Sequence, residues 1–310
     1  MKNHVKFFTK DMKFTKLNIY DMVEIHVNHG FRPCSIKLKK LLQIKTCTGH
    51  EMCYIIQMRS RGMSHISEQA DNHKAEGFIP SNKWGSDVAI SSDAIARNLL
   101  EIEEKTAHYN SRIIAVTKYY GVNALVNAYK AGIRDFGESR VLDAIEKIKS
   151  LPQEVRDNST FHFIGHLQTN KAEKAVEYFD CIQSVDSLKL AKVIANKACS
   201  LNKRERILLQ VNNASEEQKF GYDKKQLVED LPEILKLDGL EVVGLMNIAP
   251  FDISKDELRN LFADMREFKK ELEEQFDIQL SELSMGMSND YELALEEGAT
   301  MIRIGRKLFK

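Results

Sequence analysis

The sequence predicts an α/β protein, a single (β/α)8 barrel that fills residues 87–310. From Asp87 onward, short β-branched runs alternate with longer segments of helical period, and eight such runs occur. Eight parallel strands with their helices typically need about 250 residues, close to the length of this part of the chain. An open doubly wound sheet shares the alternation, which alone does not separate the two folds. We favour the barrel.

The expected strands are short apolar runs rich in β-branched residues. They lie at residues 112–117, 133–136, 160–164, 181–185, 207–211, 241–246, 282–285 and 301–304. The expected helices between them lie at 122–131, 140–150, 188–200, 224–237, 255–275 and 289–297. Ser187 and Ser254 precede apolar stripes, as helix N-caps do, and Gly132 and Gly298 end helical runs before strands. A further helix at 91–106 is expected to cover the bottom of the barrel.

Residues 1–86 differ in composition from the rest of the chain. They carry 14 basic and 7 acidic side chains, whereas residues 87–310 carry 31 basic and 38 acidic ones. The segment has no βα alternation. We expect a poorly ordered N-terminal extension, or translated sequence upstream of the true start. An organelle-targeting segment is the alternative, but such segments are rich in Arg and poor in acids, and this one favours Lys.

Composition also narrows the function. Basic and acidic residues balance, so nothing favours nucleic acid or an anionic membrane as a partner. Five irregularly spaced cysteines argue against a disulfide framework and for a reducing compartment. No stretch approaches the roughly 20 apolar residues of a membrane span, and no secretory signal is recognisable. We expect a cytoplasmic protein without a metal centre, because no ligand set has suitable spacing.

Lys118 directly follows the first expected strand. Active sites of barrels lie at the carboxyl ends of the strands. A partly desolvated amine at this edge can act as a nucleophile on a carbonyl group. The alternative is a surface lysine at a strand end.

Glycines and a hydroxyl follow the last two strands. Gly286 and Ser288 come after the seventh strand, and Gly305 after the eighth. Barrel phosphate sites are often built from these two loops, with backbone amides and hydroxyls as donors. The alternative is that the glycines are ordinary turn residues and that Ser288 caps the next helix.

Arg303 lies within the last strand, where Ile302 and Ile304 occupy the opposite face. If the isoleucines face the helices, Arg303 points into the mouth of the barrel. A buried guanidinium needs an acceptor, which a pyridine nitrogen or a structural carboxylate would supply. Of the two histidines near the third strand, His162 is expected to be a satisfied interior residue. His166 lies beyond the strand, where its ring could pack on a flat ligand.

Longer motifs together resemble one family, in unbroken order over about residues 88–309. They lie at 116–118 (VTK), 134–138 (RDFGE), 162–171 (HFIGHLQTNK), 184–187 (SVDS), 208–212 (LLQVN), 244–246 (GLM), 283–289 (LSMGMSN) and 297–305 (EGATMIRIG). In these motifs the chain resembles the pyridoxal phosphate homeostasis proteins. HFIGHLQ-x-NK and LSMGMS are the most specific of them.

The resemblance implies a monomeric barrel like the N-terminal domain of alanine racemase, with pyridoxal 5'-phosphate (PLP) held as a Schiff base on Lys118. Ser288 and Gly305 match phosphate-binding positions, Arg303 matches the arginine that faces the pyridine nitrogen, and Met246 matches the pocket floor. With the residues proposed above, the expected cofactor site comprises Lys118, His166, Met246, Gly286, Ser288, Arg303 and Gly305.

The chain departs from the family pattern in three places. Tyr119-Tyr120-Gly121 replaces the usual Thr-Lys-Pro, so the second lysine is absent. Ser139 replaces the asparagine of Gly-Glu-Asn. Few residues follow the last strand, which predicts a stunted closing helix and a looser barrel seam.

Three functions are compatible with the sequence. The favoured one is a non-catalytic PLP carrier that buffers the free aldehyde and delivers it to apo forms of PLP-dependent enzymes. The alternative is an amino-acid racemase, which needs a second base on the opposite face of the substrate. Alanine racemases take that base, a tyrosine, from a C-terminal β-domain that we do not expect here; Tyr119 or Tyr120 could substitute. The third is an interaction protein whose basic segment 1–86 binds a partner.

Overall fold

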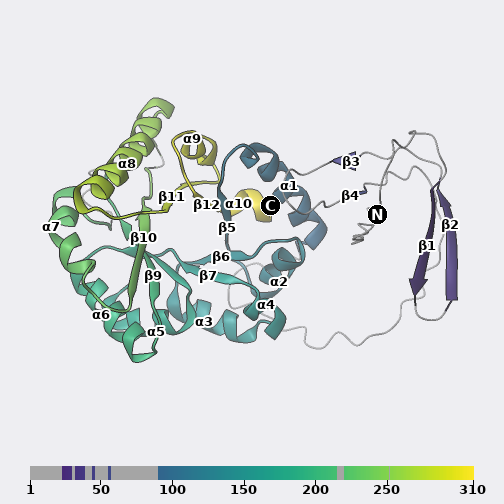
Figure 1. Ribbon diagram of the computed structural model, residues 1–310, viewed down its shortest axis with the longest axis horizontal. Coiled ribbons are helices and arrows are strands. Elements are labelled where there is room, and N and C mark those ends of the chain that lie inside the picture. The colour runs from purple at the N-terminus through teal and green to yellow at the C-terminus, as the bar shows by residue number, and fades with distance from the viewer. Residues whose placement is uncertain are drawn as a thin grey trace. The chain divides into compact units, whose positions relative to one another are not determined.

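Figure 1 shows the computed structural model of the chain. The structure describes residues 90–214, 220–250 and 252–310 and, before them, only the backbone of four strands. The chain divides into two units, Met1–Ala75 and Glu76–Lys310. The predicted boundary between residues 86 and 87 lies outside the described residues.

The first unit contains two antiparallel strand pairs. β1 (Val23–His29) pairs with β2 (Arg32–Leu38), and β3 (Ile44–Lys45) pairs with β4 (Ile55–Ile56). Apolar and polar residues alternate along β1, which is the period of a strand. From the sequence, residues 37–44 and 54–58 could form short elements, and β4 lies within the second of them, but no strand pairing was predicted. The poor order expected of the extension is not tested, because its other residues lie outside the described ones.

Eight parallel strands form a closed barrel in the second unit (Figure 1), which confirms the predicted fold. The strands are β5 (Arg112–Val116), β6 (Asp135–Glu138), β7 (Thr160–Phe163), β8 (Cys181–Val185), β9 (Glu205–Gln210), β10 (Leu240–Met246), β11 (Glu282–Met287) and β12 (Met301–Ile304). Each pairs with the next in chain order, and β12 closes the barrel on β5.

The helices form a layer outside the barrel. They are α1 (Ser92–Thr106), α2 (Val122–Lys130), α3 (Val141–Ser150), α4 (Gln153–Asp157), α5 (Thr169–Tyr178), α6 (Leu188–Ser200), α7 (Lys224–Ile234), α8 (Lys255–Phe276), α9 (Tyr291–Glu296) and α10 (Arg306–Phe309). Ser187 and Ser254 accept backbone hydrogen bonds from the first turns of α6 and α8, as predicted for N-caps. Gly132 and Gly298 have positive φ angles, which suits glycines that end helical runs.

Three elements differ from the prediction. β6 lies two residues later than expected, because the polar Asp135 and the small Gly137 weaken the apolar signal of the strand. α5 was missed, since its buried residues are mainly alanines and give only a faint apolar stripe. The five-residue helix α4 was also missed.

The expected position of the first helix was wrong. α1 does not cover the bottom of the barrel but packs in the helical layer against α2, α9 and α10. Asn98 of α1 donates hydrogen bonds to the carbonyl oxygens of Leu308 and Lys310 at 3.0 Å. The helix after β12 is short, as predicted, but α1 packs beside it at the seam between β12 and β5. The four residue pairs of that seam are in regular register, so the expected loosening is not seen.

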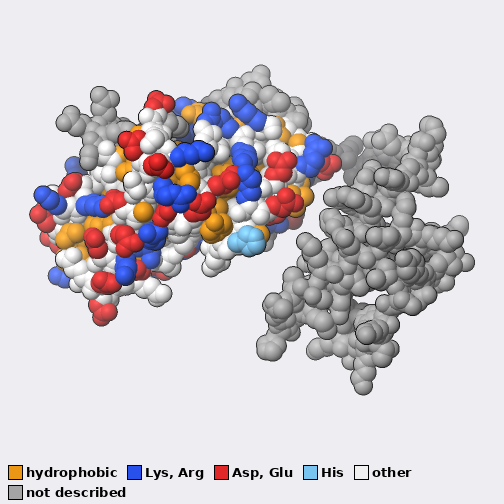
Figure 2. All heavy atoms as spheres, turned by 90° about the horizontal axis from the view of Figure 1, so that it is seen from above, with side chains coloured by type: hydrophobic (Ala, Val, Ile, Leu, Met, Phe, Trp, Pro, Cys, Tyr) orange, Lys and Arg blue, Asp and Glu red, His pale blue; other side chains and the backbone are white. Residues whose placement is uncertain are grey.

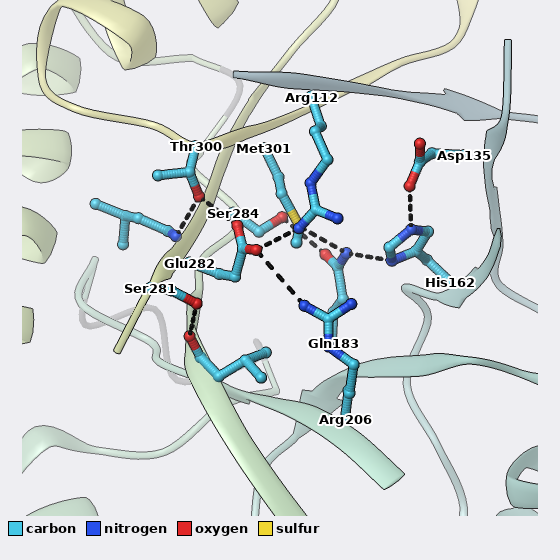
Figure 3. A network of polar contacts seen from close by, with 12 residues as sticks. Arg112, Asp135, His162, Gln183, Arg206, Ser281, Glu282, Ser284, Thr300 and Met301 are labelled. Carbon is cyan, nitrogen blue, oxygen red and sulfur yellow. Dashed lines mark hydrogen bonds and ion pairs between the residues drawn. The ribbon is translucent and has the colours of Figure 1, made fainter. Parts of the chain in front are cut away.

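The barrel interior has an apolar half and a polar half. The apolar half lies on β8, β9 and β10 and comprises Cys181, Leu208, Val243, Met246 and the partly buried Ile248. The polar half, part of which Figure 3 shows, includes Arg112, Asp135, His162, Gln183, Ser284 and Arg303. On the outside, Figure 2 shows charged side chains of both signs interspersed on the visible face of the described part.

Candidate functional site

Lys118 lies in a turn that follows β5 directly. It shares its parity along the chain with Arg112, whose side chain lies inside the barrel (Figure 3). Its ammonium lies over the ring of Tyr119, 5.2 Å from the ring centroid. The Tyr120 amide donates to the Thr117 carbonyl at 2.9 Å and the Thr117 amide to the Gly137 carbonyl at 3.0 Å, so the backbone before Lys118 is tied to β6.

A buried ion pair supports this turn, and no sequence motif predicted it. Lys147 of α3 donates to Glu138 Oε1 at 2.8 Å and to the Thr117 carbonyl at 2.9 Å, and the Thr117 hydroxyl donates to the same carboxylate at 2.7 Å. Burial raises the pKa of Glu138, while the charge of Lys147 and the hydrogen bonds oppose the rise. The only signal in the sequence is a lysine on the apolar face of α3.

Of the three candidate phosphate residues, Ser288 and Gly305 lie in adjacent loops, after β11 and after β12. Gly286, which was expected to follow the strand, lies within β11, one residue before its end. Ser288 Oγ accepts hydrogen bonds from the amides of Gly305 at 3.2 Å and Lys307 at 3.4 Å. Gly286 has a φ angle of 87°, and a Cβ there would lie 2.6 Å from that of Ala294, so the position requires glycine. These contacts hold the loop after β11 against the loop after β12.

The alternative role of Ser288 as a helix cap is wrong. α9 begins at Tyr291, and its N-cap residue is Asp290, whose carboxylate accepts a hydrogen bond from the Met287 amide. This turn displaces the start of the helix, which leaves the Ser288 hydroxyl to the Gly305 loop.

Arg303 points into the barrel, as the parity of β12 predicted. Its guanidinium donates to Ser284 Oγ and to the Asn247 carbonyl, both at 2.7 Å. The side chain is almost fully buried, and this desolvation lowers the pKa of Arg303 to about 10, an effect that the charge of Asp290 opposes. Arg303 therefore remains a cation at neutral pH, and the two oxygens that accept its hydrogen bonds are both neutral.

Strand register brings most of these residues together. Arg303 pairs with Ile114 of β5 on one side and with Met287 of β11 on the other. A Cβ on Gly305 would lie 3.5 Å from that of Val116, two residues before Lys118. Lys118, the Ser288–Gly305 contact and Arg303 thus lie toward the carboxyl ends of the adjacent strands β5, β11 and β12.

Met246 and His166 lie on other strands. Met246 is buried inside the barrel at the end of β10, in register with Ser284 of β11. His166 follows β7, stacks on Phe220 with 3.5 Å between ring centroids, and has Nδ1 3.4 Å from Asp186 Oδ2. The structure thus places Met246 beside Ser284, the partner of Arg303, whereas the contacts of His166 lie near the ends of β8 and β9.

A cavity of about 380 Å³ adjoins His166. Its lining residues come from the loop after β6, the start of α3 and the loop before α5: Ser139, Arg140, Val141, Leu142, Asp143, Phe163, His166, Gln168 and Lys171. Neither Arg303 nor its partners Ser284 and Asn247 line this cavity. The cavity beside His166 therefore does not include the surroundings of Arg303.

The opposite end of the barrel carries paired charges. Figure 3 shows Glu282 between Arg112 and Arg206, with the Thr300 hydroxyl donating to its second oxygen at 2.8 Å. These charges satisfy one another at the amino ends of the strands. In the described part of the chain, no group of three His, Cys, Asp or Glu residues could hold a metal ion. No described helix has the length and apolar composition of a membrane span.

Comparison with known proteins assigns the fold and the family. The model of the alanine racemase N-terminal domain matches residues 90–310. The pyridoxal phosphate homeostasis protein of Synechocystis sp. is 42% identical over 198 residues, which cover 64% of this chain and 90% of that protein.

Solved structures agree with this assignment of fold and family. PipY of Synechococcus elongatus, solved with PLP bound, superposes with a TM-score of 0.64 at 41% identity, over 70% of this chain and all of PipY. Alanine racemase of Clostridium difficile superposes with a TM-score of 0.59 at 18% identity over 57% of its length, a likeness of fold alone. The chain therefore belongs to the family of pyridoxal phosphate homeostasis proteins, on the fold of the alanine racemase N-terminal domain.

Proposed function

We propose that this protein binds PLP as a Schiff base on Lys118 and serves intracellular PLP homeostasis as a carrier without strong catalytic activity. The observation that carries the proposal is the convergence of Lys118, the Ser288–Gly305 contact and Arg303 on three adjacent strand ends. PLP presents an aldehyde, a phosphate and a pyridine nitrogen, which need an amine, hydrogen-bond donors and a donor to nitrogen. PLP bound to the related PipY supports the same ligand here.

The residues present fit this group. Arg303 is a buried cation that two neutral oxygens hold, so it can donate to a further acceptor such as the pyridine nitrogen. The amides of Gly305 and Lys307 converge on the hydroxyl of Ser288. Backbone amides and hydroxyls are the kind of groups that donate hydrogen bonds to phosphate oxygens. Asn247 Oδ1, beside Arg303, is buried without a hydrogen-bond partner among the described residues.

The charge of Arg303 favours a carrier over an enzyme. A fixed cation at the pyridine nitrogen opposes protonation of that nitrogen, and an unprotonated ring withdraws electrons weakly. Delivery needs no carbanion: an incoming amine adds to the imine carbon, the bond to Lys118 breaks, and the lysine leaves as a free amine. The acceptor is proposed to be an active-site lysine of an apo PLP-dependent enzyme.

A racemase is the second candidate, because the ring of Tyr119 lies beside the amine of Lys118. A racemase must interconvert L- and D-alanine, lose this activity in Lys118→Ala, and lose much of it in Tyr119→Phe. Turnover with this mutational pattern would replace the carrier proposal.

The first experiment is an absorption spectrum of the purified protein with PLP, before and after borohydride. We expect an imine band that borohydride converts into a covalent adduct on Lys118, located by peptide mapping. Lys118→Ala should lose both, whereas Lys130→Ala, an exposed lysine of α2, should keep both. A wild-type protein with no band and no adduct at saturating PLP would overturn the proposal.

A further inference from the structure

A continuous chain of hydrogen bonds runs through the barrel interior below Arg303. The residues that it joins are, in order, Arg303, Ser284, Gln183, His162 and Asp135, from β12, β11, β8, β7 and β6. Its successive distances are 2.7, 2.7, 3.1 and 2.9 Å. Figure 3 shows its lower part, with Gln183 between Ser284 and His162. The side chains of Ser284, Gln183 and His162 are wholly buried, so water does not compete for these bonds.

The directions of these hydrogen bonds follow from the Arg303 end, because each buried polar hydrogen needs an acceptor. A guanidinium can only donate, so Ser284 Oγ accepts from Arg303. The single hydroxyl proton of Ser284 then goes to Gln183 Oε1, which leaves the amide nitrogen to donate to His162 Nδ1. His162 Nδ1 is therefore unprotonated, and its Nε2 proton goes to the Asp135 carboxylate.

Gln183 transmits this direction from Ser284 to His162. Its oxygen accepts one bond, and its nitrogen donates to His162 and also lies 3.4 Å from Met301 Sδ. A turned amide would present N–H groups to the Ser284 hydroxyl. That hydroxyl would then accept from both Arg303 and the amide, and its own proton would lose its acceptor in a fully buried site.

We infer that Gln183 and His162 are positioning residues for the pyridine ring of PLP. They hold the Ser284 hydroxyl as an acceptor, and Ser284 together with the Asn247 carbonyl holds the Arg303 guanidinium toward the ring nitrogen. Neither residue touches the cofactor. Their role rests on the proposed function, because it requires that Arg303 meets PLP.

The test compares two ligands on each variant: PLP and its analogue with carbon in place of the ring nitrogen. The wild type should prefer PLP, because the analogue leaves the Arg303 N–H unpaired. Ser284→Ala and Gln183→Leu should reduce this preference by roughly tenfold, the worth of a hydrogen bond to a charged group. A general loss of fold would weaken both ligands and leave the ratio unchanged.

Two further variants sharpen the comparison. Ser184→Ala is the matched control, because Ser184 is equally buried in β8 but its hydroxyl has no partner among the described residues. It should keep the wild-type ratio. Gln183→Glu keeps an acceptor for the Ser284 proton, so it should retain most of the preference that Gln183→Leu loses.

The outcomes separate the inference from the proposed function. If the wild type forms no Lys118-dependent adduct with PLP, the proposed function fails. If it forms the adduct and prefers PLP, but Ser284→Ala and Gln183→Leu keep the full ratio, the positioning role alone is wrong.

Discussion

The buried pair under the Lys118 turn allows a quantitative prediction for Lys147→Met. The Lys147 and Glu138 side chains are 1% and 2% exposed, so removal of the ammonium leaves a carboxylate that water cannot reach. Breaking a buried pair by removing one partner typically costs about 3–5 kcal/mol. We expect a loss of this size in the free energy of unfolding at about pH 8, because methionine fills the space but cannot bond Glu138 or the Thr117 carbonyl.

The loss should depend on pH in a defined direction. Burial already raises the pKa of Glu138, and loss of Lys147 removes a charge and a hydrogen bond that oppose the rise. A carboxyl whose pKa is raised by folding contributes stability below its unfolded pKa and loses it as pH rises through the folded value. The variant should therefore be closest to the wild type in acid, where Glu138 is protonated, and furthest from it in alkali.

Urea denaturation at about pH 5 and pH 8 measures both effects, with Glu138→Gln and the double variant completing a cycle. The double variant should recover much of the loss, since no buried charge remains. Lys149→Met is the matched control on the same helix, because Lys149 is exposed and its ammonium lies over the ring of Tyr178 rather than beside a buried carboxylate. A loss in Lys147→Met below about 1 kcal/mol, or one that does not change with pH, would refute the electrostatic account.

Three further predictions concern other buried groups. Burial raises the pKa of Glu205 to about 7 despite a contact of 2.6 Å with Lys203. The free energy of unfolding of the wild type should therefore fall by about 3 kcal/mol between roughly pH 4.5 and pH 8, and urea denaturation of Glu205→Gln should not show this fall. Gly286→Ala should destabilise by about 2 kcal/mol or more in the same assay and weaken PLP binding, because alanine is strained at φ 87° and meets Ala294. In native protein, iodoacetamide should alkylate the exposed Cys199 well before Cys181, whose pKa burial raises to about 12, and mass spectrometry of the peptides would show equal labelling if this burial were wrong.

Local patterns predicted the barrel well because strand and helix periods are local properties. Seven expected strands overlap the observed ones closely, while β6 was shifted because Asp135 and Gly137 occupy its inner face. The parity of β12 also placed Arg303 inside the barrel correctly. That step needed only the contrast between Arg303 and the two isoleucines beside it.

The polar interior was not predictable in the same way. Gln183 and Ser284 lie 101 residues apart, and only closure of the barrel sets them at 2.7 Å. Lys147 is similar, since its partners follow β5 and end β6, and nothing local shows that a lysine on an apolar helix face is paired. The contacts of His166 also depend on a distant residue, Phe220. Its expected place beside the cofactor stays a prediction.

The departure from the family pattern at Tyr120 has a structural counterpart. Where the resemblance expects a lysine, the Tyr120 ring packs on Phe309 with 4.5 Å between centroids. Partial burial raises the pKa of Tyr120, and the charge of Arg306 opposes the rise, so the phenol lies close to a cation. This contact joins the Lys118 turn to α10, which directly follows Gly305.

Restoring the family lysine should therefore harm this chain. Tyr120→Lys removes an aromatic pair worth about 0.5–1.5 kcal/mol beyond its buried area and adds a second cation near Arg306. We expect urea denaturation to show a loss of about 1–3 kcal/mol, with Tyr120→Phe close to the wild type. Tyr119→Lys, a neighbour that is 61% exposed, should change stability little. If Tyr120→Lys were as stable as the wild type, Phe309 would not be the partner that makes tyrosine suitable here, and the turn would owe its position to Thr117 and Lys147 alone.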